Sequence, residues 1–340
     1  MSDGAPGRFA VVGADHLHLF SLVAGLLRAG ARPVAHTGGG DLLGGYESWQ
    51  ADSERRDLEG VLEDVDIDLV VVAGVPSERA ASAIAALESG KAVLSDKPGV
   101  TTRSQLESVR AAIAGCPGRP WTVLFSERFE NRAVTRAIEL AVGGAVGRVV
   151  HVAGAAPHSM HADQRPPWFW DPARSGGILV DIGSHQVDQF LAVTGDPASV
   201  QVGGSRVGNV ACPAHPDMQD TGTLTLLAPG VVGQHRVDWL SPRGLGVWGD
   251  VRLSITGTDG TIEVRANIDV DGRPGAEHLF VVDADGTRRV DVSADPLPWP
   301  ELLLADIADG GERLMTQAHV LAVCDVALRA QEQAGPWGAS

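Results

Sequence analysis

The chain has 340 residues, of which 44% are hydrophobic and 21% charged, a composition typical of a globular protein with well-buried cores. Its formal net charge of −16 at pH 7 excludes functions that need a basic surface, such as binding nucleic acid or anionic membranes. No apolar run approaches the ~20 residues of a transmembrane helix. Residues 1–7 are small and polar, with no basic segment before an apolar core, so we expect a cytoplasmic protein without a signal peptide.

The few cysteines and lysines limit which side chains of these two types could have a chemical role. Cys116, Cys212 and Cys324 are scattered without a CxxC pair, which predicts free buried thiols in a reducing compartment. Lys91 and Lys97 are the only lysines among 27 basic residues. Arginine does not release its proton at neutral pH, whereas lysine can be tuned to exchange one. Lys91 follows a predicted helix end and is expected at the surface, so Lys97 is the candidate functional amine.

The first 125 residues alternate short apolar strands with helices. The run Leu69–Ala73 is β-branched and continuous, as expected of a strand buried on both faces of a parallel sheet. Strands are predicted at residues 8–13, 32–36, 69–73, 92–95 and 121–125, and helices at 17–27, 77–89 and 101–113. This alternation predicts a doubly wound α/β domain of the Rossmann type over residues 1–125.

Beyond residue 125 the pattern changes to strands joined by hairpin-like turns such as Pro229-Gly230 and Asp285-Gly286. Strands are predicted at residues 148–155, 200–207, 221–227, 231–239, 251–256, 260–265, 278–282 and 288–292, and helices at 131–142, 176–188 and 302–328, the last broken at 309–311. The pattern predicts an α+β domain over residues 126–340, with a mostly antiparallel, open-faced sheet. We expect its C-terminal helix to pack back towards the first domain.

The first strand ends in Gly13, where a Rossmann domain holds a pyrophosphate on backbone N–H groups. The string Gly13-Ala14-Asp15-His16-Leu17-His18 keeps the first glycine of G-x-G-x-x-G but has Asp15 and His18 at the other two positions. Asp15 would repel phosphates unless a cation or His16 offsets it, and His18 would thicken the contact between helix and strand. The second strand ends in His36-Thr37-Gly38 and offers no acidic residue for a ribose.

A second candidate site lies on the predicted helix over 176–188. Asp181 and His185 are four residues apart and share one helix face, with Asp188 a further turn along. A carboxylate beside an imidazole can orient the ring and hold it protonated, which suits general acid–base catalysis near neutral pH. The alternative is a buried Asp–His pair whose side chains satisfy only each other's hydrogen bonds and have no catalytic role.

Other polar and aromatic residues allow two interpretations. Asp15, His16 and His18 are of metal-ligand type, but two histidines at a helix start diverge, so a complete site needs donors from elsewhere and we expect no metal. His158 and His161 either line a substrate cleft or lie in an exposed loop. Trp168, with the aromatic residues that follow it, either stacks on a sugar ring or packs inside the protein.

Three motifs in this order resemble the Gfo/Idh/MocA family, which includes glucose–fructose oxidoreductase and inositol dehydrogenase. Residues 71–98 run from Val-Val-Ala-Gly-Val-Pro to Gly-Lys-Ala-Val-Leu-Ser-Asp-Lys-Pro and resemble the family's aGkhVlxEKP signature, with Asp96 in place of Glu. Residues 176–188 are similar to its GGGxLxDxGxHxxD helix, and residues 219–221 and 255–263 to its C-terminal strands. Together they span nearly the whole chain.

The resemblance implies a nicotinamide-dependent oxidoreductase acting at a carbinol carbon of a sugar, cyclitol or related polyol. Lys97 would position the substrate hydroxyl and relay its proton, Asp181 would orient substrate, and His185 would be the acid/base. The implied NAD or NADP site comprises Gly13, Ala14, Asp15, His16, Thr37, Gly74, Pro76, Asp96 and Lys97, and the implied substrate site His158, His161, Trp168, Asp181 and His185.

The resemblance also implies a homodimer or homotetramer formed through the sheet of the second domain. Two alternatives stay open because the nucleotide loop is altered. One is a non-redox enzyme, catalysing elimination or isomerisation with or without a metal. The other is a non-catalytic family member that acts as a sensor or assembly subunit.

Overall fold

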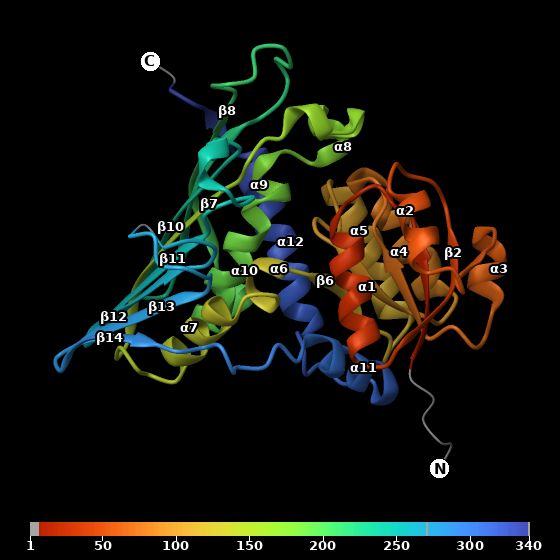
Figure 1. Ribbon diagram of the computed structural model, residues 1–340, viewed down its shortest axis with the longest axis horizontal. Coiled ribbons are helices and arrows are strands. Elements are labelled where there is room, and N and C mark those ends of the chain that lie inside the picture. The colour runs from red at the N-terminus through yellow and green to blue at the C-terminus, as the bar shows by residue number, and fades with distance from the viewer. Residues whose placement is uncertain (1–6, 270, 339–340) are drawn as a thin grey trace. The chain divides into compact units, whose positions relative to one another are not determined.

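The computed structural model describes residues 7–269 and 271–338, which form two compact units (Figure 1). The first unit runs to Leu124 and includes residues 173–176 and 298–321; the second holds residues 125–172, 177–297 and those from 322 onward. Residues 298–321, assigned from sequence to the second domain, therefore cluster with the first unit. Residues 1–6 of the polar N-terminal segment lie outside the described part.

A parallel sheet forms the centre of the first unit. Its strand order is β3-β2-β1-β4-β5-β6, and every neighbouring pair is parallel. The strands are β1 (Arg8–Val12), β2 (Arg32–Thr37), β3 (Glu54–Arg55), β4 (Leu69–Val72), β5 (Ala92–Asp96) and β6 (Trp121–Leu124). Because the order reverses between β1 and β4, the carboxyl ends of these two strands mark the place where such sheets bind ligands. The predicted Rossmann-type sheet is confirmed, and only the short β3 was not foreseen.

Helices pack on this sheet with recognisable local signals. Pro76 begins α4, Thr102 caps α5 by accepting from the Gln105 N–H, and Asp57 caps α3 by accepting from the Gly60 N–H. The helices are α1 (His18–Arg28), α2 (Leu43–Trp49), α3 (Leu58–Glu63), α4 (Pro76–Glu88), α5 (Arg103–Gly115), α11 (Trp299–Asp309) and the start of α12 (Gln317–Glu332). Helix α11 lies beside α1, where a Cβ on Gly25 would lie 2.1 Å from the Trp299 ring. Helices α2 and α3 were not predicted from the sequence.

The second unit contains a mixed sheet with the order β14-β13-β12-β11-β7-β10-β9-β8-β15. The β7–β10 and β8–β15 pairs are parallel and the others are antiparallel. The strands are β7 (Val149–Pro157), β8 (Gln201–Gly208), β9 (Thr221–Ala228), β10 (Val231–Asp238), β11 (Arg252–Gly257), β12 (Gly260–Arg265), β13 (His278–Asp283), β14 (Gly286–Val290) and β15 (Gly335–Pro336). The expected mostly antiparallel second domain is confirmed.

Helices of the second unit gather on one face of this sheet (Figure 1). They are α6 (Ser126–Phe129), α7 (Arg132–Val142), α9 (Ile178–Asp181), α10 (Gly183–Thr194) and the end of α12. Of α8 (Pro172–Ser175), Pro172 belongs to the second unit and the rest to the first; short 3-10 turns occur at Ala162–Gln164, Pro167–Trp170, Pro197–Ser199 and Arg243–Leu245. Glycines let α10 approach the sheet closely, since a Cβ on Gly154 would lie 1.9 Å from Gln186 Oε1. The single helix expected over 176–188 is divided into α9 and α10, with Ile182 between them. Among the described residues, no helix is both long and apolar enough to span a membrane.

Two expectations about single residues need correction. Lys91 is not at the surface: it is 3% exposed, and its Nζ donates to the backbone carbonyls of Asp64 and Ile67, where the carbonyls replace water around the ammonium group. The three cysteines are free, but only Cys324 is buried, while Cys116 and Cys212 are half-buried. The amine of Lys91 thus has a structural partner set, which leaves Lys97 as the candidate for chemistry.

Candidate active site

The turn after β1 is built on a glycine that no other residue can replace without strain. Gly13 has φ +76°, and a Cβ on it would lie 2.5 Å from the Gly74 Cα at the end of β4. Its N–H donates to the Thr37 carbonyl (3.0 Å), and the Ala14 N–H donates to the Gly39 carbonyl (2.8 Å). The turn is therefore clamped between the ends of β2 and β4, and the predicted nucleotide-loop residues Gly13, Ala14, Thr37 and Gly74 lie together.

Asp15 occupies the position of the second fingerprint glycine. Its N–H donates to the Ala73 carbonyl (3.1 Å), and a Cβ on Gly74 would lie 3.8 Å from its Oδ2, so the carboxyl faces the turn after β4. Burial raises the pKa of Asp15, and the charges of Glu78 and Asp41 raise it further. The acidic neighbours Glu78 and Asp41 therefore add negative charge around the carboxyl that replaces the second fingerprint glycine.

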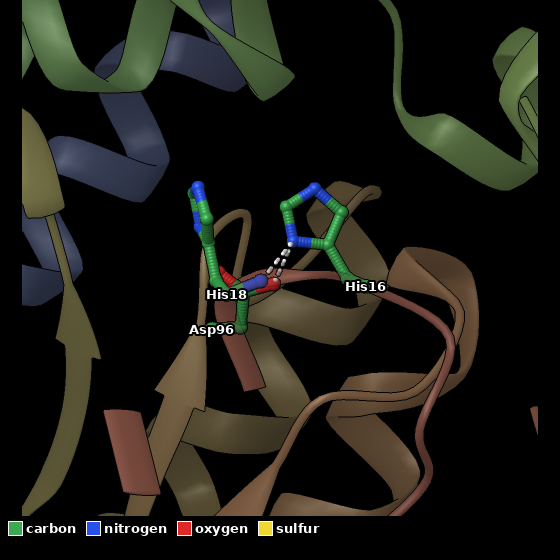
Figure 2. Close-up of side chains that lie close together, drawn as sticks. All are labelled: His16, His18 and Asp96. Carbon is green, nitrogen blue, oxygen red and sulfur yellow. Dashed lines mark hydrogen bonds and ion pairs between the residues drawn. The ribbon is translucent and has the colours of Figure 1, made fainter. Parts of the chain in front are cut away.

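His16 and His18 both reach Asp96, the last residue of β5 (Figure 2). His16 Nδ1 lies 2.8 Å from Asp96 Oδ2, and His18 Nδ1 lies 2.9 Å from Asp96 Oδ1. His18 therefore does not act as a wedge between helix and strand as expected, because its ring extends to this carboxylate and stays 31% exposed. Burial lowers the pKa of His16 to about 4, against the opposing effect of Asp96.

Arg79 of α4, which the sequence analysis did not single out, fixes the chain on both sides of Lys97. The Arg79 guanidinium is completely buried; it donates to the Gly74 carbonyl (2.8 Å), to Asp96 Oδ2 (2.9 Å) and to the Lys97 and Pro98 carbonyls. Burial alone would raise the pKa of Asp96, but Arg79 and the two histidines hold it well below its usual range. An arginine inside an alanine-rich helix carries no sequence signal of this role.

In the second unit, Asp181 ends α9 and His185 lies in the first turn of α10. The Asp181 carbonyl accepts from Ser184 Oγ (2.9 Å), and the buried His185 ring meets Phe125 edge-on with 6.2 Å between centroids. A second arginine missed from sequence, Arg165, is held by the Phe169 and Trp239 rings (4.3 and 4.5 Å). Burial lowers the pKa of Arg165, and the charge of Asp181 opposes that shift. Asp181 is thus in the field of a half-buried cation.

A buried polar network surrounds the inner face of α10. Asp188 pairs with Arg128 (2.9 Å), which explains its burial without a catalytic role. Glu127 Oε2 accepts from Gln186 Nε2 and Gln189 Nε2 (3.1 and 3.2 Å), and its Oε1 lies 3.8 Å from His158 Nε2. These contacts tie α6, α10 and the end of β7 into one framework.

The other predicted substrate residues have different surroundings. His158 is half-buried and packs against Trp248 and Trp239 with centroids 4.6 and 5.3 Å apart. His161 is exposed and has φ +46°. Trp168 is buried and meets Phe169 edge-on at 6.4 Å. Lys97 belongs to the first unit, and Asp181, His185 and these three residues belong to the second.

Comparisons with known proteins agree with this architecture. Residues 24–116 match the model of an oxidoreductase family with an NAD-binding Rossmann fold, and residues 134–263 match the GFO/IDH/MocA C-terminal domain. The first match begins after the altered glycine loop. The chain is 28% identical to inositol 2-dehydrogenase 2 of Saccharopolyspora erythraea over 221 residues, which is 64% of this chain and 60% of that protein.

Two solved structures share the fold over almost the whole chain. A protein of Erwinia carotovora atroseptica SCRI1043, described as a candidate oxidoreductase, is 34% identical with a TM-score of 0.93, covering 97% of this chain and 99% of its own. Levoglucosan dehydrogenase, solved in complex with NADH and levoglucosan, is 20% identical with a TM-score of 0.76, covering 96% and 98%. The matched N- and C-terminal domain models, found on a chain with this pair of sheets, show that it belongs to the GFO/IDH/MocA oxidoreductase family.

Proposed function

We propose that the protein is an NAD- or NADP-dependent oxidoreductase that transfers hydride to or from a carbinol carbon of a sugar, cyclitol or related polyol. The observation that carries the proposal is the placement of Lys97. It directly follows β5 at the carboxyl edge of a Rossmann-type sheet and is held there by Arg79. The polyol class is supported by relatives named inositol 2-dehydrogenase and levoglucosan dehydrogenase.

The residues at the β1/β4 switch point fit a dinucleotide. Gly13 permits a close backbone approach, and the turn that it forms is held between the ends of β2 and β4. Gly13, Ala14, Asp15, His16, Thr37, Gly74, Pro76, Asp96 and Lys97 would hold the cofactor, whose nicotinamide accepts or delivers the hydride. Strand β2 ends in Thr37 and offers no carboxylate to a ribose 2′-hydroxyl, so both NAD and NADP are tested as cofactors.

The protein's own residues would handle the proton and the substrate. Lys97 would bind the reacting hydroxyl and relay its proton, His185 would act as acid/base, and Asp181 would orient substrate. His158, His161 and Trp168 are proposed to contact the rest of the polyol. Assembly into a homodimer or homotetramer through the nine-stranded sheet stays a prediction.

The test begins with calorimetric titration of the purified chain with NADH and NADPH, after a denatured sample has been checked for carried-over nucleotide. Micromolar binding of either is expected, followed by turnover in a polyol screen. Lys97→Ala and His185→Gln should each lower kcat by about 10²–10⁴-fold with unchanged circular dichroism. His151→Gln, on β7 outside the proposed site, serves as the control. No nucleotide bound and none carried over would refute the proposal.

A further inference from the structure

The three side chains of Figure 2 come from two distant parts of the chain. His16 and His18 lie at the start of α1, and Asp96, 78 residues beyond His18, ends β5. The turn at Gly13 and the parallel pairing of β1, β4 and β5 bring them to the same sheet edge. Figure 2 shows both imidazole rings on one side of the Asp96 carboxylate. The fold thus supplies the third donor that two neighbouring histidines need.

One possible ligand atom from each of these residues lies within 4.8 Å of the others. Two imidazoles and one carboxylate form a donor set that binds Zn²⁺ and related d-block ions and leaves further coordination positions open. Ligand nitrogens about 2.1 Å from a tetrahedral ion lie roughly 3.4 Å apart. The Nδ1–Oδ distances of 2.8 and 2.9 Å therefore need to lengthen by only about 0.5 Å for an ion to replace the two bridging protons.

The exposure of the donors suits an ion that exchanges with solvent. Asp96 is 1% exposed, whereas the His16 and His18 side chains are 18% and 31% exposed. A buried carboxylate anchor with partly open imidazoles leaves a side of the site from which an ion and its water can enter. Structural zinc sites, in contrast, are closed by four protein ligands.

The surrounding charges limit the affinity of the site, and its donor atoms determine the kind of ion. Arg79 already pairs with Asp96 Oδ2 at 2.9 Å, and Lys97 is close enough to act on His16. These cations oppose a dication, so we expect micromolar rather than tighter binding. The donor set, with two imidazoles and one carboxylate, selects against Mg²⁺ and Ca²⁺, which need several oxygen ligands, and favours ions that bond strongly to imidazole.

From this geometry we propose that His16, His18 and Asp96 form a binding site for a divalent d-block cation of the Zn²⁺ and Co²⁺ class, with open positions for water or a ligand oxygen. The proposal goes beyond the oxidoreductase function and does not depend on it. The altered nucleotide loop supplies both imidazoles, and His16 and Asp96 are also among the residues proposed to hold the cofactor. An ion here would also offset the charge of Asp15.

The experiment uses the full chain without an affinity tag, stripped with a chelator and titrated with Co²⁺, Zn²⁺ and Mg²⁺ by calorimetry. Co²⁺ binding is followed in parallel through its visible ligand-field bands, a readout independent of turnover. We expect one Co²⁺ or Zn²⁺ bound per chain and no binding of Mg²⁺. The visible bands of bound Co²⁺ should be those of an ion with imidazole nitrogen ligands.

The variants His16→Gln and His18→Gln keep an amide donor towards Asp96, so the fold should be preserved while the ligand is lost. Each is expected to weaken Co²⁺ binding by roughly tenfold or more, and His151→Gln should leave it unchanged. The proposal is overturned if wild-type protein takes up neither ion. It is equally overturned if both glutamine variants bind with wild-type affinity, because the ion would then be held elsewhere.

Discussion

Arg79→Met is the substitution that most directly tests how the first unit positions Lys97. The change removes the guanidinium and keeps most of the aliphatic stem. Arg79 is 1% exposed and Asp96 is 1% exposed, so the variant leaves a buried carboxylate without its arginine, together with backbone carbonyls of Gly74 and Pro98 that lose a donor.

Breaking a buried ion pair by removing one partner costs about 3–5 kcal/mol, because the remaining charge stays desolvated. His16 and His18 still contact Asp96, which places the expected loss near the lower end, at about 3 kcal/mol. At about 2–4 °C per kcal/mol for a domain of this size, the melting temperature should fall by about 10 °C.

The assay is urea unfolding followed by far-UV circular dichroism, together with scanning calorimetry. Arg110→Met is the matched control, because Arg110 forms an exposed pair with Glu107 on α5 (3.6 Å) and its loss should cost below about 0.5 kcal/mol. Arg79→Lys keeps the charge but not the fork of donors, and should recover only part of the stability. If Arg79→Met unfolds within 0.5 kcal/mol of wild type, the reasoning on this buried network is refuted.

Two further predictions concern the Gly13 turn and a buried histidine. Gly13→Ala should destabilise the first unit by about 1–3 kcal/mol and abolish nucleotide binding, because φ is +76° and the added Cβ would meet Gly74. Gly39→Ala is the control: a Cβ there meets open space, so urea titration should show nearly unchanged stability. Equal stability of the two variants would contradict the strain expected at Gly13. Burial and the charge of His151 lower the pKa of His235 on β10 to about 3, so between pH 6.5 and 3 the unfolded state binds a proton that the folded state does not. The neutral His235 therefore causes no loss of folding stability above pH 6.5, and on acidification the free energy of unfolding falls, by about 2 kcal/mol at pH 5. His235→Gln should remove that part of the pH dependence, and wild type and variant with parallel stability curves from pH 8 to 5 would show that the histidine is not buried neutral.

Much of the fold could be predicted because its signals are local. The β-branched run of β4 and the alternation of strands with helices indicate a parallel sheet, and the turn residues after residue 220 indicate an antiparallel one. The segments missed were α2, α3 and β3, which are too short to show a full period. The break at Ile182 was also missed, since each side of it has the same helical spacing as the continuous helix that we expected.

Side-chain partners were harder to predict, because they depend on contacts between distant segments. Lys91 and Lys97 are both rare lysines near the ends of β5, yet one is tied to backbone carbonyls and the other follows Asp96 at the sheet edge. Asp188 looked like a third member of the Asp181/His185 set, but it pairs with Arg128, which comes from α6. No spacing in the sequence distinguishes these outcomes.

The sequence by itself determined the two sheets and the glycine turn after β1, since periodicity and motif order are properties of neighbouring residues. It also singled out Lys97, Asp181 and His185, whose catalytic roles stay a prediction. Only the tertiary structure decided that His16 and His18 meet Asp96, that Arg79 holds both flanks of Lys97, and that burial and the charges of Glu78 and Asp41 raise the pKa of Asp15. The physical reason is that burial and charge act through space, and parallel β-strands bring together at one edge residues that the chain keeps 80 positions apart.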